Sequence, residues 1–211
     1  FRMANVHPEK FTRPQGILIK NTMVKWGARI SGRDGVDFED LTQAEIEARE
    51  KTMALINELK QKEPGFEDSH LVQTATNIGV RETRHFIGEY MITEEDAIKG
   101  ARFDDVVAIS SNPVPRYYGK RFFFDHEGFD IPYRSLVPKK IDNLLLAGRC
   151  ISAHQVPFQS LRSMAPLMAI AQAAGTAAAL CAKNNVTPRK LDVSKLQQVL
   201  IKQNAELRRH S

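Results

Sequence analysis

The clearest pattern of apolar and polar positions lies in the first third of the chain. Thr42 and Glu45 have the spacing of a capping box, in which each side chain bonds the backbone amide of the other residue. Apolar residues then recur at helical spacing until Pro64-Gly65 interrupts the pattern. The sequence therefore predicts a helix that begins near Thr42 and ends before Pro64. Its predicted buried positions are Ile46, Met53, Ile56 and Leu59.

Two early segments have strand character. In residues 24–30 the apolar residues Val24, Trp26, Ala28 and Ile30 alternate with glycine or charged residues, which is the period of a half-buried strand. Residues 16–20 are its expected partner, and the glycine-containing stretch 31–35 is an expected turn. Residues 78–92 (IGVRETRHFIGEYMI) also have strand character, around an unusually charged centre.

The middle of the chain predicts a short helix and then a buried strand. Thr93 and Asp96 form a second capping pair, and Gly100 closes the short helix that they open. Residues 103–130 hold many aromatic residues and several prolines, which is typical of irregular strands and loops. Residues 141–148 (IDNLLLAG) have the pattern of a short apolar strand that is buried on both faces.

The last third of the chain predicts two helices. The longest uncharged run extends from Met164 to Ala182, 19 residues, which is long enough to span a bilayer. Nine of these residues are Ala, and a proline and two polar residues lie among them, so we expect a buried helix and no membrane span. A final amphipathic helix is capped by Asp192 or Ser194. Its apolar positions are Leu196, Val199, Leu200 and Leu207.

Composition places the chain among ordinary globular proteins. It has 211 residues, of which 42% are hydrophobic and 26% charged, so at roughly 150 residues per domain one or two domains are expected. The net charge of +5 is spread along the chain, which favours a solvated surface over a nucleic-acid groove. Two cysteines are too few for a disulfide scaffold. No cellular location follows from these features.

The most informative segment for function runs from Asn143 to Ala182. A buried strand, a loop and a helix of small residues follow one another, and Ala171, Gly175 and Ala179 leave one helix face nearly bare. The N-terminus of such a helix presents unpaired N–H groups and a partial positive charge, which suits an anionic ligand or a reduced cofactor. The residues alone predict a ligand-binding edge of an α/β domain.

Several motifs in this region resemble one known family. The runs LLLAGRCISA (144–153) and SLRSMAPLMAIAQAAGTAAAL (160–180) resemble the C-terminal signature of FAD-dependent oxidoreductases related to fumarate reductase and succinate dehydrogenase flavoproteins. GVRETRHFIGEYMITEED (79–96) and FDIPYRSLVPKKIDNLLLAGRC (129–150) extend the likeness. The motifs keep the family's order over about residues 35–205, so their combination is specific.

The resemblance implies FAD as cofactor and places its contacts. Ala147, Gly148 and Arg149 match the residues near the ribityl chain of the flavin. The segment 162–165 matches the helix start that turns its amides toward the N1/O2 edge, where hydride arrival places negative charge. The residues of that segment are Arg162, Ser163, Met164 and Ala165.

The resemblance also gives candidate catalytic residues. Arg81 and Arg84 belong to a motif beside the family's substrate cavity, and in a strand they would face opposite ways. A structural ion-pair network is the alternative for these charges. His154 is the candidate for acid–base chemistry, although Gln155 stands where the family often has its loop histidine. No metal is expected, because the consecutive residues 125–127 (DHE) rarely converge on one ion.

One family feature is absent from the sequence. These flavoproteins hold the FAD pyrophosphate with a G-x-G-x-x-G turn, and no two of the twelve glycines here are separated by a single residue. The chain, which begins with Phe1, is therefore expected to be the C-terminal portion of a longer flavoprotein, to depend on a partner for that half, or to have lost flavin binding.

The predicted fold is α/β. Residues 1–134 are expected to form part of a β-rich substrate (cap) domain with inserted helices. Residues 135–211 are expected to form the returning part of a Rossmann-like FAD-binding domain with a terminal helix. The predicted reaction is hydride transfer from a small organic substrate to flavin N5. The alternative is a non-catalytic binding or structural module that keeps the flavoprotein scaffold, and no nucleic-acid partner is expected.

Overall fold

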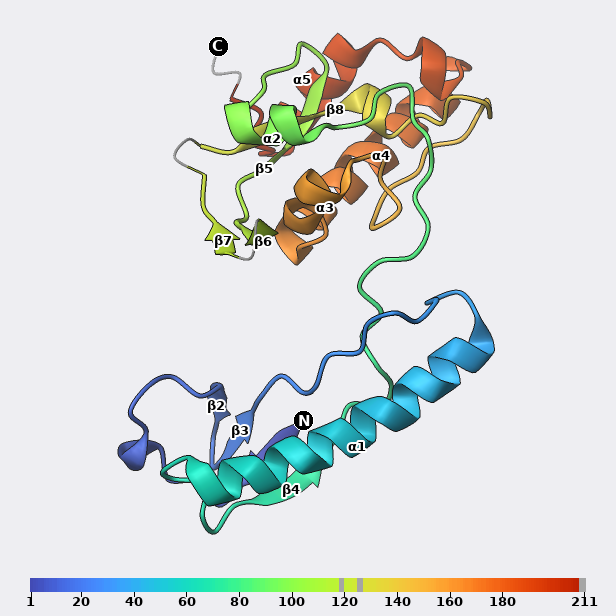
Figure 1. Ribbon diagram of the computed structural model, residues 1–211. Coiled ribbons are helices and arrows are strands. Elements are labelled where there is room, and N and C mark those ends of the chain that lie inside the picture. Colours follow the sequence, from blue (N-terminus) through green and yellow to red (C-terminus); the bar gives the residue numbers. More distant parts are fainter. Residues whose placement is uncertain (118–119, 125–126, 209–211) are drawn as a thin grey trace. The chain divides into compact units, whose positions relative to one another are not determined.

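The computed structural model describes residues 1–117, 120–124 and 127–208, which form two compact units with small antiparallel sheets and helices (Figure 1). The first unit comprises residues 1–83 and the second residues 84–211. The fold is therefore mixed α/β, as expected. The predicted boundary at residue 134 lies inside the second unit, where β8 (Phe129–Pro132) pairs with β5 (Val106–Ser110). The functional division into a cap domain (1–134) and an FAD domain (135–211) stays a prediction.

The first unit packs one long helix, α1 (Phe38–Lys62), along a four-stranded sheet (Figure 1). The strand order is β2-β3-β1-β4, with all neighbours antiparallel. The strands are β1 (Arg2–Ala4), β2 (Ile17–Ile19), β3 (Thr22–Val24) and β4 (His70–Gln73), and a 3-10 helix, η1, covers Pro8–Lys10. The core between helix and sheet consists of Met3, Met23, Ile56, Leu59 and Phe66.

Helix α1 begins earlier than its sequence pattern predicts. Asp37 is the N-cap, and its carboxylate accepts the backbone N–H groups of Glu39 and Asp40. Thr42 lies inside the helix, one turn after Phe38, and its hydroxyl donates to the carbonyl of Phe38. The predicted buried positions Ile56 and Leu59 are confirmed, and Ile46 and Met53 are wrong because nearly half of each side chain is exposed.

The predicted strand at residues 24–30 is wrong, because β3 ends at Val24. Trp26 is 90% exposed, so the alternation of apolar residues here does not face a core. The predicted partner is confirmed in position, since β2 lies within residues 16–20 and pairs with β3 in a tight hairpin.

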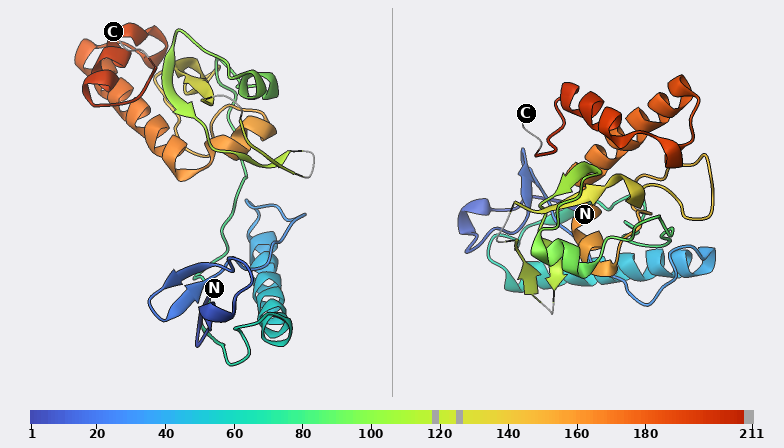
Figure 2. Two further views of the ribbon diagram at one scale, coloured as in Figure 1. Left: turned by 90° about the vertical axis from the view of Figure 1, so that its left-hand side faces the viewer. Right: turned by 90° about the horizontal axis from the view of Figure 1, so that it is seen from above.

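The second unit is built around the antiparallel pair β5–β8 (Figure 2). Helices α4 (Met164–Asn184) and α5 (Val193–Lys202) contact β5 on one side of the pair, and α2 (Glu94–Lys99) contacts β8 on the other (Figure 2). Helix α3 (Gln155–Leu161) contacts β6 (Val114–Tyr117), which pairs with β7 (Lys120–Phe122). Two 3-10 helices, η2 (Tyr133–Ser135) and η3 (Pro188–Lys190), complete the unit.

Both predicted C-terminal helices are confirmed. Asp192 caps α5, and Leu196 and Leu200 are buried. The assignment of Leu207 to this helix is wrong, because α5 ends at Lys202 and Leu207 is buried in the segment that follows it. Helix α4 is long and apolar enough to cross a membrane by length and composition, and one third of its most apolar window is buried. Its packed side includes Ile170, Ala173 and Ala177, all fully buried in the core of the second unit.

Two segments predicted as strands lie outside the regular sheets of the described chain. Residues 141–148 form loop, and Ile141 and Leu144 are exposed, because no neighbouring strand in the described residues covers them. The β-pairing of residues 78–92 in the described chain is limited to two isolated bridges, Gly88–Pro138 and Ile92–Ala153. The predicted short helix is confirmed as α2, with Thr93 and Asp96 in a complete capping box and Gly100 in the left-handed region.

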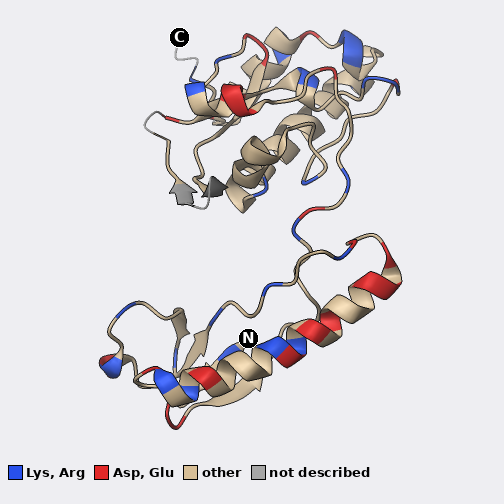
Figure 3. Ribbon diagram, viewed as in Figure 1, with Lys and Arg blue, Asp and Glu red and all other residues tan. Residues whose placement is uncertain are grey.

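Charged residues are interspersed along α1 and through both units, and α4 is almost free of them (Figure 3). The charges on α1 form ion pairs one turn apart. These pairs are Glu45–Arg49, Glu47–Lys51 and Glu58–Lys62. Such pairs are typical of a solvated helix face.

Candidate functional site

The segment from His85 to Ile92 joins the loops that hold most of the predicted site. On one side, the N–H of Phe86 donates to the carbonyl of Cys150 at 3.1 Å, and the N–H of Ile92 donates to the carbonyl of Ser152 at 3.1 Å. On the other side, the N–H of Glu89 donates to the carbonyl of Val137 at 2.9 Å. These bonds hold the 85–92 segment between residues 137–139 and 150–154.

The predicted ribityl contacts form a turn at one end of this arrangement. Gly148 has φ of +111°, a conformation that strongly favours glycine, and a Cβ at this position would meet no heavy atom within 4 Å. The turn is closed by the N–H of Ile151, which donates to the carbonyl of Gly148 at 3.2 Å. Ala147 and Arg149 are exposed on this turn. The backbone here is therefore open to the approach of a ligand.

Helix α3 leads from this turn to the start of α4. Arg162 is the C-cap of α3 and its N–H donates to the carbonyl of Phe158 at 2.9 Å. Ser163 follows as the N-cap of α4 in an extended conformation, and its side chain makes no capping hydrogen bond. Met164 is 79% exposed and Ala165 is also exposed. The structure thus places all four residues 162–165 at one helix N-terminus.

This helix start is suited to negative charge. The first backbone N–H groups of a helix lack partners within the helix, and the aligned peptide dipoles add a partial positive charge. Pro166 has no N–H, so the donors of the first turn are the amides of Met164 and Ala165. An anionic group of a ligand can be stabilised there without any charged side chain.

The candidate catalytic residues are divided between the two units. Arg81 belongs to the first unit, whereas Arg84 and His154 belong to the second, so a shared site for the three residues stays a prediction. Arg84 is exposed directly before His85. The alternation of faces predicted for residues 81–84 does not apply, because this segment is not a strand.

His154 lies at the N-cap of α3. Its backbone N–H donates to the carbonyl of Ile92 at 2.8 Å, and its own carbonyl accepts the N–H of Phe158 at 3.0 Å. Its side chain makes no capping hydrogen bond and the residue is exposed. The backbone of His154 therefore connects the start of α3 to Ile92, and acid–base chemistry by its side chain stays a prediction.

Two residues of this region were missed by the sequence reasoning. The ring of His85 approaches the carbonyl of Ile151 and packs edge-on against Phe158. The hydroxyl of Ser152, which is fully buried, accepts the N–H of Gly88 at 3.0 Å. A histidine in the charged centre of the 78–92 segment was the available signal for His85, whereas nothing local distinguishes Ser152.

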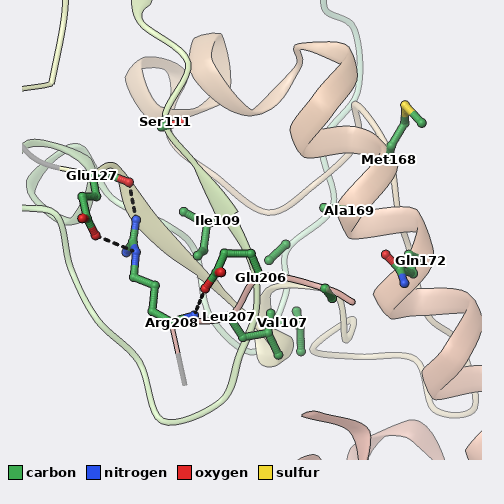
Figure 4. Close-up of a pocket in the computed structure, with 12 residues that line it drawn as sticks. Val107, Ile109, Ser111, Glu127, Met168, Ala169, Gln172, Glu206, Leu207 and Arg208 are labelled. Carbon is green, nitrogen blue, oxygen red and sulfur yellow. Dashed lines mark hydrogen bonds and ion pairs between the residues drawn. The ribbon is translucent and has the colours of Figure 1, made fainter. Parts of the chain in front are cut away.

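A separate pocket of about 1040 Å³ lies between β5, α4 and residues 205–208 (Figure 4). Its walls are largely apolar, with Val107, Ile109, Met168 and Leu207 among them. At one end Arg208 forms an ion pair with Glu127 (Figure 4) and hydrogen-bonds the buried carboxylate of Asp130 at 2.8 Å. None of the predicted site residues lines this pocket.

Neither metal nor thiol chemistry is indicated by the described residues. No three His, Cys, Asp or Glu side chains gather there in a way that could hold a metal ion, and Asp125 and His126 lie outside the described residues. Burial raises the pKa of the Cys181 thiol, which keeps it protonated. Cys150 is half-buried, with its Sγ 3.8 Å from the carbonyl oxygen of Ala147.

Comparison with known families gives the class of protein to which this geometry belongs. The model of the FAD dependent oxidoreductase family matches residues 2–200 of the chain. The chain therefore belongs to this family, and its cofactor is FAD. Searches of curated proteins and of solved structures found no match.

The residues present fit the flavin end of FAD. The amides at the start of α4 suit the N1/O2 edge of a flavin, and the turn at Gly148 leaves its backbone open. A cradle for the pyrophosphate is not found in the sequence, because no glycine pair has the G-x-G spacing. The contacts of this chain with the flavin and its ribityl chain stay predictions.

Proposed function

We propose that this chain is the C-terminal, flavin-side portion of an oxidoreductase related to fumarate reductase and succinate dehydrogenase flavoproteins. FAD, when bound, supplies N5 as the acceptor of a hydride from a small organic substrate. The observation that carries the proposal is the start of α4, where Met164 and Ala165 are exposed residues of the first turn and the side chain of the N-cap Ser163 makes no capping hydrogen bond.

The residues of the chain have distinct proposed roles. The amides of Met164 and Ala165 stabilise negative charge at the N1/O2 edge, while Arg162 and Ser163 hold the helix start. Ala147, Gly148 and Arg149 contact the ribityl chain. Arg84 and Arg81 orient the substrate, and His154 transfers a proton to or from it.

A G-x-G-x-x-G half from a longer chain or a partner completes the proposed Rossmann-like domain. This proposal is supported by residues 141–148, an apolar stretch whose Ile141 is 56% exposed in the present chain. Such a stretch becomes a strand when a neighbouring parallel strand supplies its hydrogen bonds. The predicted strand at 141–148 then forms in the complete domain.

The proposal includes neither a membrane span nor a nucleic-acid partner. Helix α4 is a core helix and no membrane span, which its packing against β5 and α5 supports. No nucleic-acid partner is proposed, because the charges of α1 pair with one another. The alternative function, a non-catalytic scaffold, is favoured by one observation, the missing G-x-G spacing.

The test uses the Met164→Pro variant. Proline is well tolerated at the first position of a helix, where it removes one N–H and keeps the helix, and the extended Ser163 accommodates a following proline. The visible absorption spectrum is recorded after FAD is added to the protein and unbound FAD is removed. We expect flavin to be retained, with an affinity about tenfold lower in Met164→Pro because one charge-assisted hydrogen bond is lost.

Met164→Leu is the matched control, because it changes the side chain and keeps the amide. Equal FAD affinity in the two variants contradicts the role of the helix start. A folded wild-type protein that retains no flavin contradicts flavin binding by this chain and favours the scaffold.

A further inference from the structure

We infer that His85 is a positioning residue, whose single ring holds both the 148–151 turn and helix α3 and so fixes the two flavin-facing segments relative to each other. The inference rests on the proposed function, because it takes the turn and the start of α4 as the flavin contacts. His85 is not among the site residues predicted from the sequence.

The first contact of the ring is with the turn. Nδ1 of His85 lies 3.0 Å from the carbonyl oxygen of Ile151. A carbonyl oxygen only accepts hydrogen bonds, so Nδ1 carries the proton and donates it. The N–H of Ile151 closes the turn onto Gly148, so the ring bonds the residue that completes the turn. The neighbouring bond from Phe86 N–H to the carbonyl of Cys150 keeps the two backbones in register.

The second contact is with α3. The ring centroids of His85 and Phe158 are 4.5 Å apart, with the ring planes at 88°, which is an edge-to-face contact. Phe158 is fully buried, so its ring is a fixed surface for the histidine. The carbonyl of Phe158 accepts the N–H of Arg162, and Arg162 immediately precedes the N-cap of α4. The ring therefore contacts the residue that anchors the end of α3.

Two substitutions of His85 test the two contacts separately. In His85→Phe an aromatic ring remains against Phe158, but the donor is lost and the Ile151 carbonyl loses its partner on this residue. In His85→Asn the amide nitrogen takes nearly the position of Nδ1, so the donor is kept and the ring contact is lost. An unsatisfied carbonyl costs more than a weakened ring contact.

The experiment measures the FAD dissociation constant by absorbance titration, with the melting temperature, for the wild-type chain and the two variants. We expect the dissociation constant to rise about tenfold in His85→Phe and to stay within about threefold in His85→Asn. His70→Asn, on the exposed face of β4 in the first unit, is the matched control and is expected to bind FAD as the wild type does. If His85→Phe does not fold, His85→Gln replaces it, because its amide reaches the position of Nε2 and not that of Nδ1.

A lower melting temperature with an unchanged dissociation constant in His85→Phe gives the residue a merely structural role and overturns the inference. Binding by His85→Asn as weak as that of His85→Phe overturns the role of the Nδ1 bond. The ¹⁵N chemical shifts of the His85 ring show, without any FAD, which ring nitrogen carries the proton. A proton on Nε2 with none on Nδ1 overturns the assignment. A wild-type protein that binds no FAD overturns the proposed function and this inference together, whereas FAD binding that no His85 substitution changes overturns the inference alone.

Discussion

At the scale of single residues, Asp96 shows how one carboxylate organises the entry to α2. Its Oδ2 accepts the hydroxyl of Tyr90 at 2.7 Å and both the N–H and the hydroxyl of Thr93 at 2.8 Å. The guanidinium of Arg134 lies over the Tyr90 ring, 4.8 Å from its centroid. Burial, together with the hydrogen bond to Asp96, raises the pKa of Tyr90 to about 12. The 85–92 segment is thus fixed at its C-terminal end as well as by His85.

This pKa predicts a loss of stability at alkaline pH. The folded protein holds the Tyr90 proton more tightly than the unfolded chain, whose tyrosine pKa is about 10. The contribution is complete below pH 10 and is lost as pH rises through about 12, so the free energy of unfolding is expected to fall by roughly 1 kcal/mol between pH 9 and pH 11. Urea unfolding of the second unit at pH 9 and pH 11 measures it. The fall is expected to be smaller in Tyr90→Phe, and an equal fall in both proteins contradicts the assignment to Tyr90.

At the scale of secondary-structure elements, α1 shows how neighbouring caps compete. Thr42 and Glu45 have capping-box spacing, yet Glu45 is used elsewhere, since its carboxylate accepts the N–H of Ile78 at 2.7 Å and bonds Arg49. Asp37 caps the helix instead, one turn earlier. A tertiary contact thus removes the side chain that the local motif needs, and the helix extends to the next available cap.

The position of the cap can be tested by a pair of alanine substitutions. Asp37→Ala removes the acceptor of two backbone amides and is expected to lower the free energy of unfolding of the first unit by about 1 kcal/mol. Thr42→Ala inside the helix is expected to change it by less than about 0.5 kcal/mol. Urea titration followed by circular dichroism measures both. A larger effect at Thr42 than at Asp37 contradicts the observed helix start.

At the scale of the whole molecule, the two units have separate cores. Phe66 is fully buried in the core of the first unit, and Phe158 is fully buried in that of the second. Each core is assembled from residues of its own unit. Residues that share one core unfold together, so two separate cores favour two separate unfolding transitions.

We therefore expect two unfolding transitions in urea. Phe66→Ala is expected to destabilise one transition by about 3–5 kcal/mol and Phe158→Ala the other by a similar amount, because each leaves a cavity in a single core. Phe11, a half-buried ring stacked on Phe66, offers a milder control, since Phe11→Leu is expected to shift the same transition as Phe66→Ala by less. A single transition that both alanine variants shift equally contradicts this description.

Local signals were sufficient for several elements and for part of the site. Thr93 with Asp96, Asp192, and the Ala-rich run from Met164 each predict a helix because caps and helical spacing act over a few residues. The family resemblance placed residues 162–165 at the start of the Ala-rich helix. His85 could not be assigned in this way, because its partners Ile151 and Phe158 are more than sixty residues away in the chain.

The sequence by itself determined the family, the cofactor, and the helices whose caps and periodicity are local. Only the tertiary structure decided which apolar patterns become strands. Residues 25–30 and 141–148 have strand patterns and yet form no strand in the described chain, because a strand requires a neighbour to take up its backbone hydrogen bonds. The tertiary structure likewise decided that Arg81 and Arg84 fall in different units, since the division of a chain into cores depends on long-range packing and leaves no mark in the local sequence.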